Sequence, residues 1–144
     1  MIKLFILILT LSLSTLAKVE IINPHIAHVI PGSSITAAFL KLKNTSDESI
    51  DLLSVEAKWA NSVELHNHVM EKGVMSMRKM DKMTIPANGE LILKSKSYHI
   101  MIFGLKEELK LDDIKILKLN FSNKKSQEIK FKVIDVYAKG YKHP

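Results

Sequence analysis

The stretch KILKLNFSNKKSQEIKFKVIDV, residues 115–136, decides the fold class of this 144-residue chain. It holds two segments of strand length, residues 115–121 and 127–136, in which apolar residues alternate with polar ones or run together. Turn-forming residues, Ser122–Lys125, separate the two segments, as expected for two strands joined by a turn. The same pattern recurs in two earlier segments, residues 35–42 and 62–69. Short strands at this rhythm predict an all-β domain, an antiparallel, immunoglobulin-like β-sandwich.

The remaining turn signals fit this interpretation. They are Pro31-Gly32, Asn44–Asp47, Gly73 and Pro86–Gly89. Only two short segments, residues 55–61 and 109–113, are candidates for helix. No repeat, linker or low-complexity segment divides the chain. We therefore expect a single domain over residues 18–138, followed by a short polar tail over residues 139–144.

The first 17 residues have the composition of a secretory signal peptide. Lys3 supplies the positive charge, Leu4–Leu13 the apolar region, and Thr15–Ala17 a cleavage site of small residues. The apolar run is shorter than the roughly 20 residues of a transmembrane helix. We expect cleavage after about Ala17, a periplasmic location and no stable membrane insertion of the mature protein. An uncleaved N-terminal anchor is the alternative.

Composition excludes several classes of function. The chain has no cysteine, so disulfides, thiolate metal ligands, cysteine nucleophiles and a cysteine-linked lipid anchor are all excluded. The net charge is +6, but the lysines are interleaved with acidic residues instead of forming a stripe. We therefore expect neither a nucleic-acid partner nor an anionic lipid surface. A weak docking role toward an acidic protein stays open, and we expect a monomer.

Histidine and methionine cluster in the second half of the chain. Six of the seven methionines lie between Met70 and Met101, together with three of the six histidines between residues 66 and 99. The stretch VELHNHVMEKGVMSMRKM, residues 63–80, predicts two strands joined by a four-residue loop at residues 70–73. This register places His66 opposite Met77 and His68 opposite Met75. Side chains paired in this way are close enough to share one metal ion.

A third strand is predicted over SYHIMIF, residues 97–103. Alternation along a strand puts His99 and Met101 on one face and leaves Ile100 and Ile102 to face the core. Thioether sulfur is a soft ligand suited to Cu(I), and imidazole binds Cu(I) as well. The alternative for each residue alone is structural, because methionine often fills gaps in a core and histidine is often simply hydrogen bonded.

The spacing of His66, Met77, His99 and Met101 is H-x10-M-x21-H-x-M, which resembles the signature of the periplasmic copper chaperone family PCuAC. The segments AAFLKLKNTSDESIDLLSV and IPANGELILKSKSYHIMIFGLKEEL also resemble that family, so that the likeness extends from about Asn23 to Val136. It implies a cupredoxin-like β-sandwich that binds one Cu(I). The implied metal ligands are His66, Met77, His99 and Met101.

The resemblance also implies a partner and a role. Copper would pass to cytochrome c oxidase assembly, at the CuA centre or together with a Sco-type chaperone, and the protein would not be an enzyme. Met70 would line the site without binding, while the hairpin register suggests His68 and Met75 as reserve or entry ligands. His25 and His28 are either surface residues or a weak accessory Cu(II) site. Lys96–Tyr98 depart from the proline- and glycine-rich approach of the family.

The sequence also bears on functions other than that of a copper chaperone. An immunoglobulin-like extracytoplasmic binding module without metal function is the main alternative. A blue-copper electron carrier needs a cysteine thiolate, which this chain does not have. No nucleophile–base pair, glycine-rich phosphate loop or carboxylate cluster points to an enzyme.

Overall fold

The computed structural model of the protein describes residues 18–144, and the predicted signal peptide, residues 1–17, lies outside the described residues. The described part consists of strands, turns and loops without a helix, which confirms the all-β class. Within it, no helix is long and apolar enough to cross a membrane. The strands are β1 (Val19–Ala27), β2 (Ile35–Asn44), β3 (Ile50–Glu56), β4 (Ala60–Glu71), β5 (Val74–Met80), β6 (Met83–Ile85), β7 (Glu90–Leu93), β8 (His99–Leu105), β9 (Ile114–Phe121) and β10 (Ser126–Ile134).

The two helical candidates were wrong. Residues 55–61 form the end of β3, a turn and the start of β4, and residues 109–113 are irregular with a turn. Both segments are too short to stabilise an isolated helix. Both segments instead connect consecutive strands. Their backbone groups form hydrogen bonds within the sheet or in turns.

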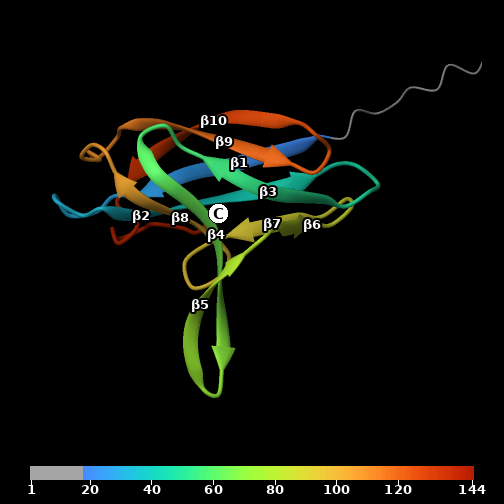
Figure 1. Cartoon of the computed structure of the whole chain (residues 1–144), viewed down its shortest axis with the longest axis horizontal. Coiled ribbons are helices and arrows are strands. Elements are labelled where there is room, and N and C mark those ends of the chain that lie inside the picture. Colours follow the sequence, from blue (N-terminus) through green and yellow to red (C-terminus); the bar gives the residue numbers. More distant parts are fainter. Residues whose placement is uncertain (1–17) are drawn as a thin grey trace, which may run out of the picture.

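The strands follow one hydrogen-bonded path, β5-β4-β8-β2-β1-β10-β9-β3-β6, with β7 pairing β2 beside it. Figure 1 shows this path folded into two layers, with β10, β9 and β3 in one and β2, β8 and β4 in the other. All pairs are antiparallel except β1 with β10, which run parallel. The chain is therefore a β-sandwich with one parallel pair.

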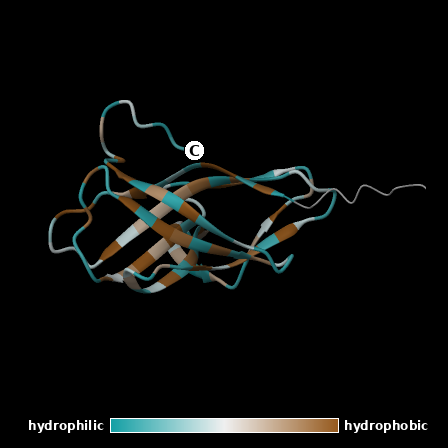
Figure 2. Cartoon of the chain, turned by 90° about the horizontal axis from the view of Figure 1, so that it is seen from above, coloured by the Kyte–Doolittle hydropathy of each residue, from teal (hydrophilic) through white to brown (hydrophobic). Residues whose placement is uncertain are grey.

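The core lies between the two layers and is built from alternate residues of each strand. Figure 2 shows apolar and polar residues alternating along the strands. Ile100 and Ile102 of β8 are fully buried, with Leu117 and Leu119 of β9 among the other fully buried side chains. The expected orientation of Ile100 and Ile102 toward the core is confirmed. Consequently the other face of β8, which carries His99 and Met101, points away from the core.

The β4–β5 hairpin projects beyond the sandwich (Figure 1), and its register differs from our expectation. The structure pairs His68 with Met77, Met70 with Met75, and Glu71 with Val74. The loop is thus only Lys72-Gly73, and both residues have positive φ, 49° and 77°. Positive φ at both positions is typical of the two-residue type I′ turn that fits the twist of a hairpin. The predicted four-residue loop was wrong.

The observed register of the β4–β5 hairpin differs from the predicted register by two residues at every pair. His66 lies opposite Lys79 rather than Met77, and His68 lies opposite Met77 rather than Met75. Because side chains alternate with a period of two, a shift of two residues leaves each side chain on its predicted face. The histidines and methionines therefore still share one side of the hairpin.

Candidate metal centre

Three neighbouring strands carry the candidate ligands on the outer face of one layer. In the β4–β8 ladder His66 lies opposite His99 and Glu64 lies opposite Met101. On the other side of β4, the β5 ladder places Met77 opposite His68. Side chains opposite or diagonal to each other in such ladders lie within reach of one ion. The structure thus brings all four residues of the sequence motif to one patch.

His99 is the most buried of these side chains, with 3% of its surface exposed. Its Nδ1 donates a hydrogen bond of 2.8 Å to the carbonyl oxygen of Ser97. The turn before β8 holds this carbonyl in place, since Ser97 N donates to Lys94 O and Lys94 N to Tyr98 O. The turn over residues 94–98 therefore orients the ring. With Nδ1 donating, the lone pair of the neutral ring is on Nε2.

The charge state of His99 also favours metal binding. Burial lowers its pKa below the ordinary value of 6.5, and the neighbouring His68 and His66 lower it further, against an opposing effect of the Ser97 hydrogen bond. The imidazole is accordingly neutral at pH 7. A metal must displace a proton from a charged histidine, so a neutral imidazole binds without that loss.

His66 is oriented by a carboxylate. Its Nε2 lies 2.8 Å from Glu64 Oε2, and Lys79 Nζ lies 3.0 Å from Glu64 Oε1. These hydrogen bonds to His66 and Lys79 lower the pKa of Glu64, so the carboxylate is ionised and can only accept. Nε2 therefore donates to this carboxylate, and in the neutral tautomer Nδ1 carries the lone pair. His66 Nδ1 is buried and has no hydrogen-bond partner, which is the state expected of a metal ligand in the absence of its ion.

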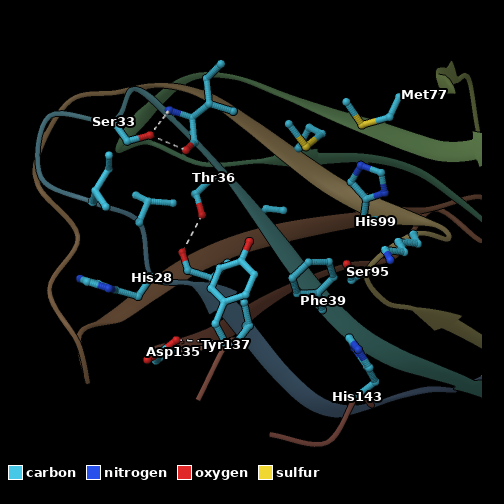
Figure 3. A pocket seen from close by; sticks show the side chains of 18 of the residues that line it. His28, Ser33, Thr36, Phe39, Met77, Ser95, His99, Asp135, Tyr137 and His143 are labelled. Carbon is cyan, nitrogen blue, oxygen red and sulfur yellow. Dashed lines mark hydrogen bonds between the residues drawn. The ribbon is translucent and has the colours of Figure 1, made fainter. Parts of the chain in front are cut away.

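The two sulfur donors stand at the edge of a cavity of about 720 Å³. Met77 is 48% exposed, whereas Met101 is half-buried. The cavity is lined by His68, Met77, His99 and Met101 together with residues of the loop after β1 and of the C-terminal segment. Figure 3 shows Met77 beside His99, with His143 on the other side of Phe39.

The donor set limits which metals fit. Among residues 18–144, no three or more His, Cys, Asp or Glu side chains are arranged to hold a metal ion. A metal bound here would need the methionine sulfurs. Thioether ligands suit Cu(I) and contribute little to Zn(II), Mg(II) or Ca(II). The residues present therefore fit Cu(I) best.

The residues expected next to the ligands are the reserve or entry ligands His68 and Met75 and the site-lining Met70. The structure separates them into two groups. His68 lies within the patch, and its ring centroid is 5.0 Å from that of His99. Met70 and Met75 pair with each other near the tip of the hairpin, are 62% and 48% exposed, and do not line the cavity. The register error had suggested His68 and Met75 as equivalent neighbours, and the structure distinguishes them.

The N-terminal histidines differ from the surface interpretation. His25 is only 2% exposed, its Nδ1 donates to Asn23 O at 2.9 Å, and its Nε2 lies at hydrogen-bond distance from the Tyr141 hydroxyl. His28 lines the cavity, as does His143 from the C-terminal tail. Sequence reasoning did not connect these residues because the tail reaches β1 only in the folded chain. The sequence feature that could have indicated these contacts is the presence of Tyr141 and His143 in an otherwise polar tail.

Comparison with known sequences gives two related findings. Residues 19–133 match the protein-family model described as "LpqE-like: Putative lipoprotein LpqE-like". The chain is also 31% identical over 105 residues to "Putative lipoprotein Lxx21020" of Leifsonia xyli subsp. xyli. The matched region covers 72% of this chain and 63% of that protein, so the chain spans less than two thirds of its length.

Solved structures with the same fold include copper-binding domains. The copper-bound PCuAC domain from PmoF2 superposes with a TM-score of 0.71 at 15% identity, over 82% of this chain and 93% of that one. The solution structure of CuI-DR1885 from Deinococcus radiodurans is 29% identical, with a TM-score of 0.67 over 80% of this chain and 77% of that one. The apo form of DR1885 gives a TM-score of 0.64 at 30% identity, covering 81% of this chain and 78% of that one. The expected cupredoxin-like, immunoglobulin-like sandwich is confirmed.

Proposed function

From the premise that the chain belongs to the LpqE-like family, whose members are of PCuAC type, we propose that it is a copper chaperone carrying one Cu(I) ion. Two imidazoles and two thioethers form a neutral shell for the ion. The proposed ligands are His66, Met77, His99 and Met101. Copper is the cargo of this protein rather than a catalytic group.

One observation carries the proposal. Two histidines on facing strands, His66 and His99, each have one ring nitrogen fixed by a hydrogen bond and the other free to bind. Met77 and Met101 belong to the same face of the neighbouring strands. Ligands held in one orientation by outer hydrogen bonds are the usual arrangement of a metal site. A core or surface cluster would not require these orientations.

The exposure of the ligands supports transfer rather than storage. His99 is buried, whereas Met77 is 48% exposed at the edge of the cavity. A partner protein can therefore approach the ion from the Met77 side and replace one ligand at a time. We propose a copper-accepting partner in the periplasm, such as a cytochrome c oxidase subunit or a Sco-type chaperone, and no catalytic step.

A competition titration with a colorimetric Cu(I) chelator tests this function. We expect one equivalent of Cu(I) to bind, and Met77→Leu to weaken binding at least about tenfold. Met75→Leu is the matched control, because Met75 lies on the same strand and face and is equally exposed, at 48%. His99→Ala is expected to weaken binding more than Met77→Leu. Unchanged affinity in both Met77→Leu and His99→Ala would rule out this metal site.

A further inference from the structure

We propose that His68 is an additional copper ligand that exchanges with His66, giving the ion two positions that share His99. This inference rests on the proposed copper-carrying function and extends it to the path by which the ion leaves. The inner position uses His66, and the outer position uses His68 at the cavity. Both positions use methionine sulfur.

The first support is distance. The ring centroid of His68 lies 5.0 Å from that of His99, whereas the His66 centroid lies 5.9 Å from it. His68 also lies directly opposite Met77 in the β4–β5 ladder. Directly opposite residues are closer than diagonal ones, which is the relation of His66 to Met77. His68 is thus placed at least as well as His66 to share an ion with His99 and Met77.

The second support is an unsatisfied nitrogen. His68 Nδ1 is buried and has no hydrogen-bond partner, like Nδ1 of His66. A buried polar atom without a partner destabilises a fold. Two such nitrogens flank His99 from the same strand. A copper ion shared between them would satisfy each in turn.

The third support is the shape of the cavity. His68, Met77, His99 and Met101 line it, but His66 does not. Glu64 instead binds Nε2 of His66 through a 2.8 Å hydrogen bond. The ion therefore meets solvent and a partner protein beside His68, while His66 keeps it away from the cavity. Exchange from His66 to His68 moves the ion toward the acceptor without breaking its bond to His99.

Cu(I) affinities of a double-mutant cycle test the exchange. We expect His66→Ala and His68→Ala each to lose less than about tenfold in affinity, because the other imidazole replaces the missing one. The double variant should lose at least about a hundredfold. If either single variant loses as much as the double variant, the exchange is overturned. His68→Gln, which keeps the size of the side chain, repeats the test should His68→Ala fold poorly.

The transfer rate gives a second, independent reading. We expect His68→Ala to release Cu(I) to the chelator at least about fivefold more slowly in stopped-flow measurements, since the outer position is lost. His28→Ala is the control, because His28 lines the same cavity but lies outside the ligand strands. An unchanged rate in His68→Ala overturns the exchange. Failure of the proposed function itself is seen separately, as normal affinity in His99→Ala and Met77→Leu.

Discussion

Glu64 decides which nitrogen of His66 is free to bind a metal. It is ionised, it accepts from Nε2, and it is itself held by Lys79. Such outer partners commonly change metal affinity by 10–100-fold when removed. Glu64 and His66 share a face because they lie two residues apart on β4, but the sequence alone does not show that they touch.

We therefore expect Glu64→Ala to lower Cu(I) affinity about 10–100-fold when the variant and its parent are both measured in a His68→Ala background, in which His68 cannot replace His66. Glu64→Gln should lose less, since its amide oxygen can still accept from His66. Glu71→Ala is the control on the same strand, because Glu71 pairs with Arg78 and not with a histidine. Chelator competition measures all three variants. Equal affinity of Glu64→Ala and Glu71→Ala would contradict the role of Glu64.

His25 makes the stability of the metal-free protein depend on pH. Burial lowers its pKa below 6.5, and the nearby His143 lowers it further, while the hydrogen bond to Asn23 opposes both. In the unfolded chain His25 takes up a proton near pH 6.5, and in the folded chain only at lower pH. Its contribution to stability is thus complete above pH 6.5 and is lost as pH falls toward the folded pKa.

We expect the free energy of unfolding of metal-free protein to decrease between pH 7 and pH 5, and to decrease less steeply in His25→Gln. One histidine changes the slope by at most about 1.4 kcal/mol per pH unit. The lowered pKa of His99 acts in the same direction, but it is present in both proteins and cancels in the comparison. Urea denaturation at several pH values measures the slopes. Equal slopes would contradict the assignment.

At the scale of elements, strand faces were predictable and registers were not. The alternation in residues 97–103 correctly placed Ile100 and Ile102 in the core. The hairpin register depends instead on the left-handed conformation of Lys72, φ 49°. Lysine rarely adopts a left-handed conformation. The Asn-Gly or Asp-Gly sequence that is typical of a type I′ turn is absent from this hairpin. No local pattern could distinguish a two-residue loop from a four-residue one.

Gly104 allows the ligand strand β8 to end close against β4. Its φ is +67°, and a Cβ atom at this position would lie 2.7 Å from Asn61 Cβ. Gly32 has a similar φ of +84°, with no atom within 4 Å of the same position. Alanine substitutions at these two glycines therefore distinguish the effect of backbone strain from the effect of a collision with Asn61.

We expect Gly32→Ala to lower the free energy of unfolding by about 1–2 kcal/mol, from backbone strain alone. Gly104→Ala should lose about 1–3 kcal/mol more, because Asn61 or the strand must shift. Urea denaturation with a common m-value compares the two variants. Equal losses would show that the contact between β8 and Asn61 is not tight.

At the scale of the whole molecule, the sequence predicted the fold class and placed the proposed ligands on one face. Period-two alternation is a local property, so six of the ten described strands could be predicted from it, whereas β1, β3, β6 and β7 were not. The cavity could not, because it forms where the loop after β1, the strand β8 and the C-terminal segment meet. The burial of His25 under Tyr141 has the same long-range origin.

Copper should stabilise the whole domain, because its proposed ligands lie on three strands that come together only in the folded state. We expect free Cu(I) at a hundred times its dissociation constant to raise the free energy of unfolding by about 2.7 kcal/mol. Thermal unfolding under reducing, anaerobic conditions measures this shift. An identical midpoint with and without Cu(I), in protein that has taken up the ion, would contradict a site that depends on the fold.

X-ray absorption of the Cu(I) protein tests the central claim most directly, because it identifies the atoms around the ion. We expect a shell of about two nitrogen and two sulfur scatterers, as two imidazoles and two thioethers require. The sulfur contribution should decrease by half in Met77→Leu and remain unchanged in Met75→Leu. A shell of nitrogen and oxygen atoms alone would contradict the account.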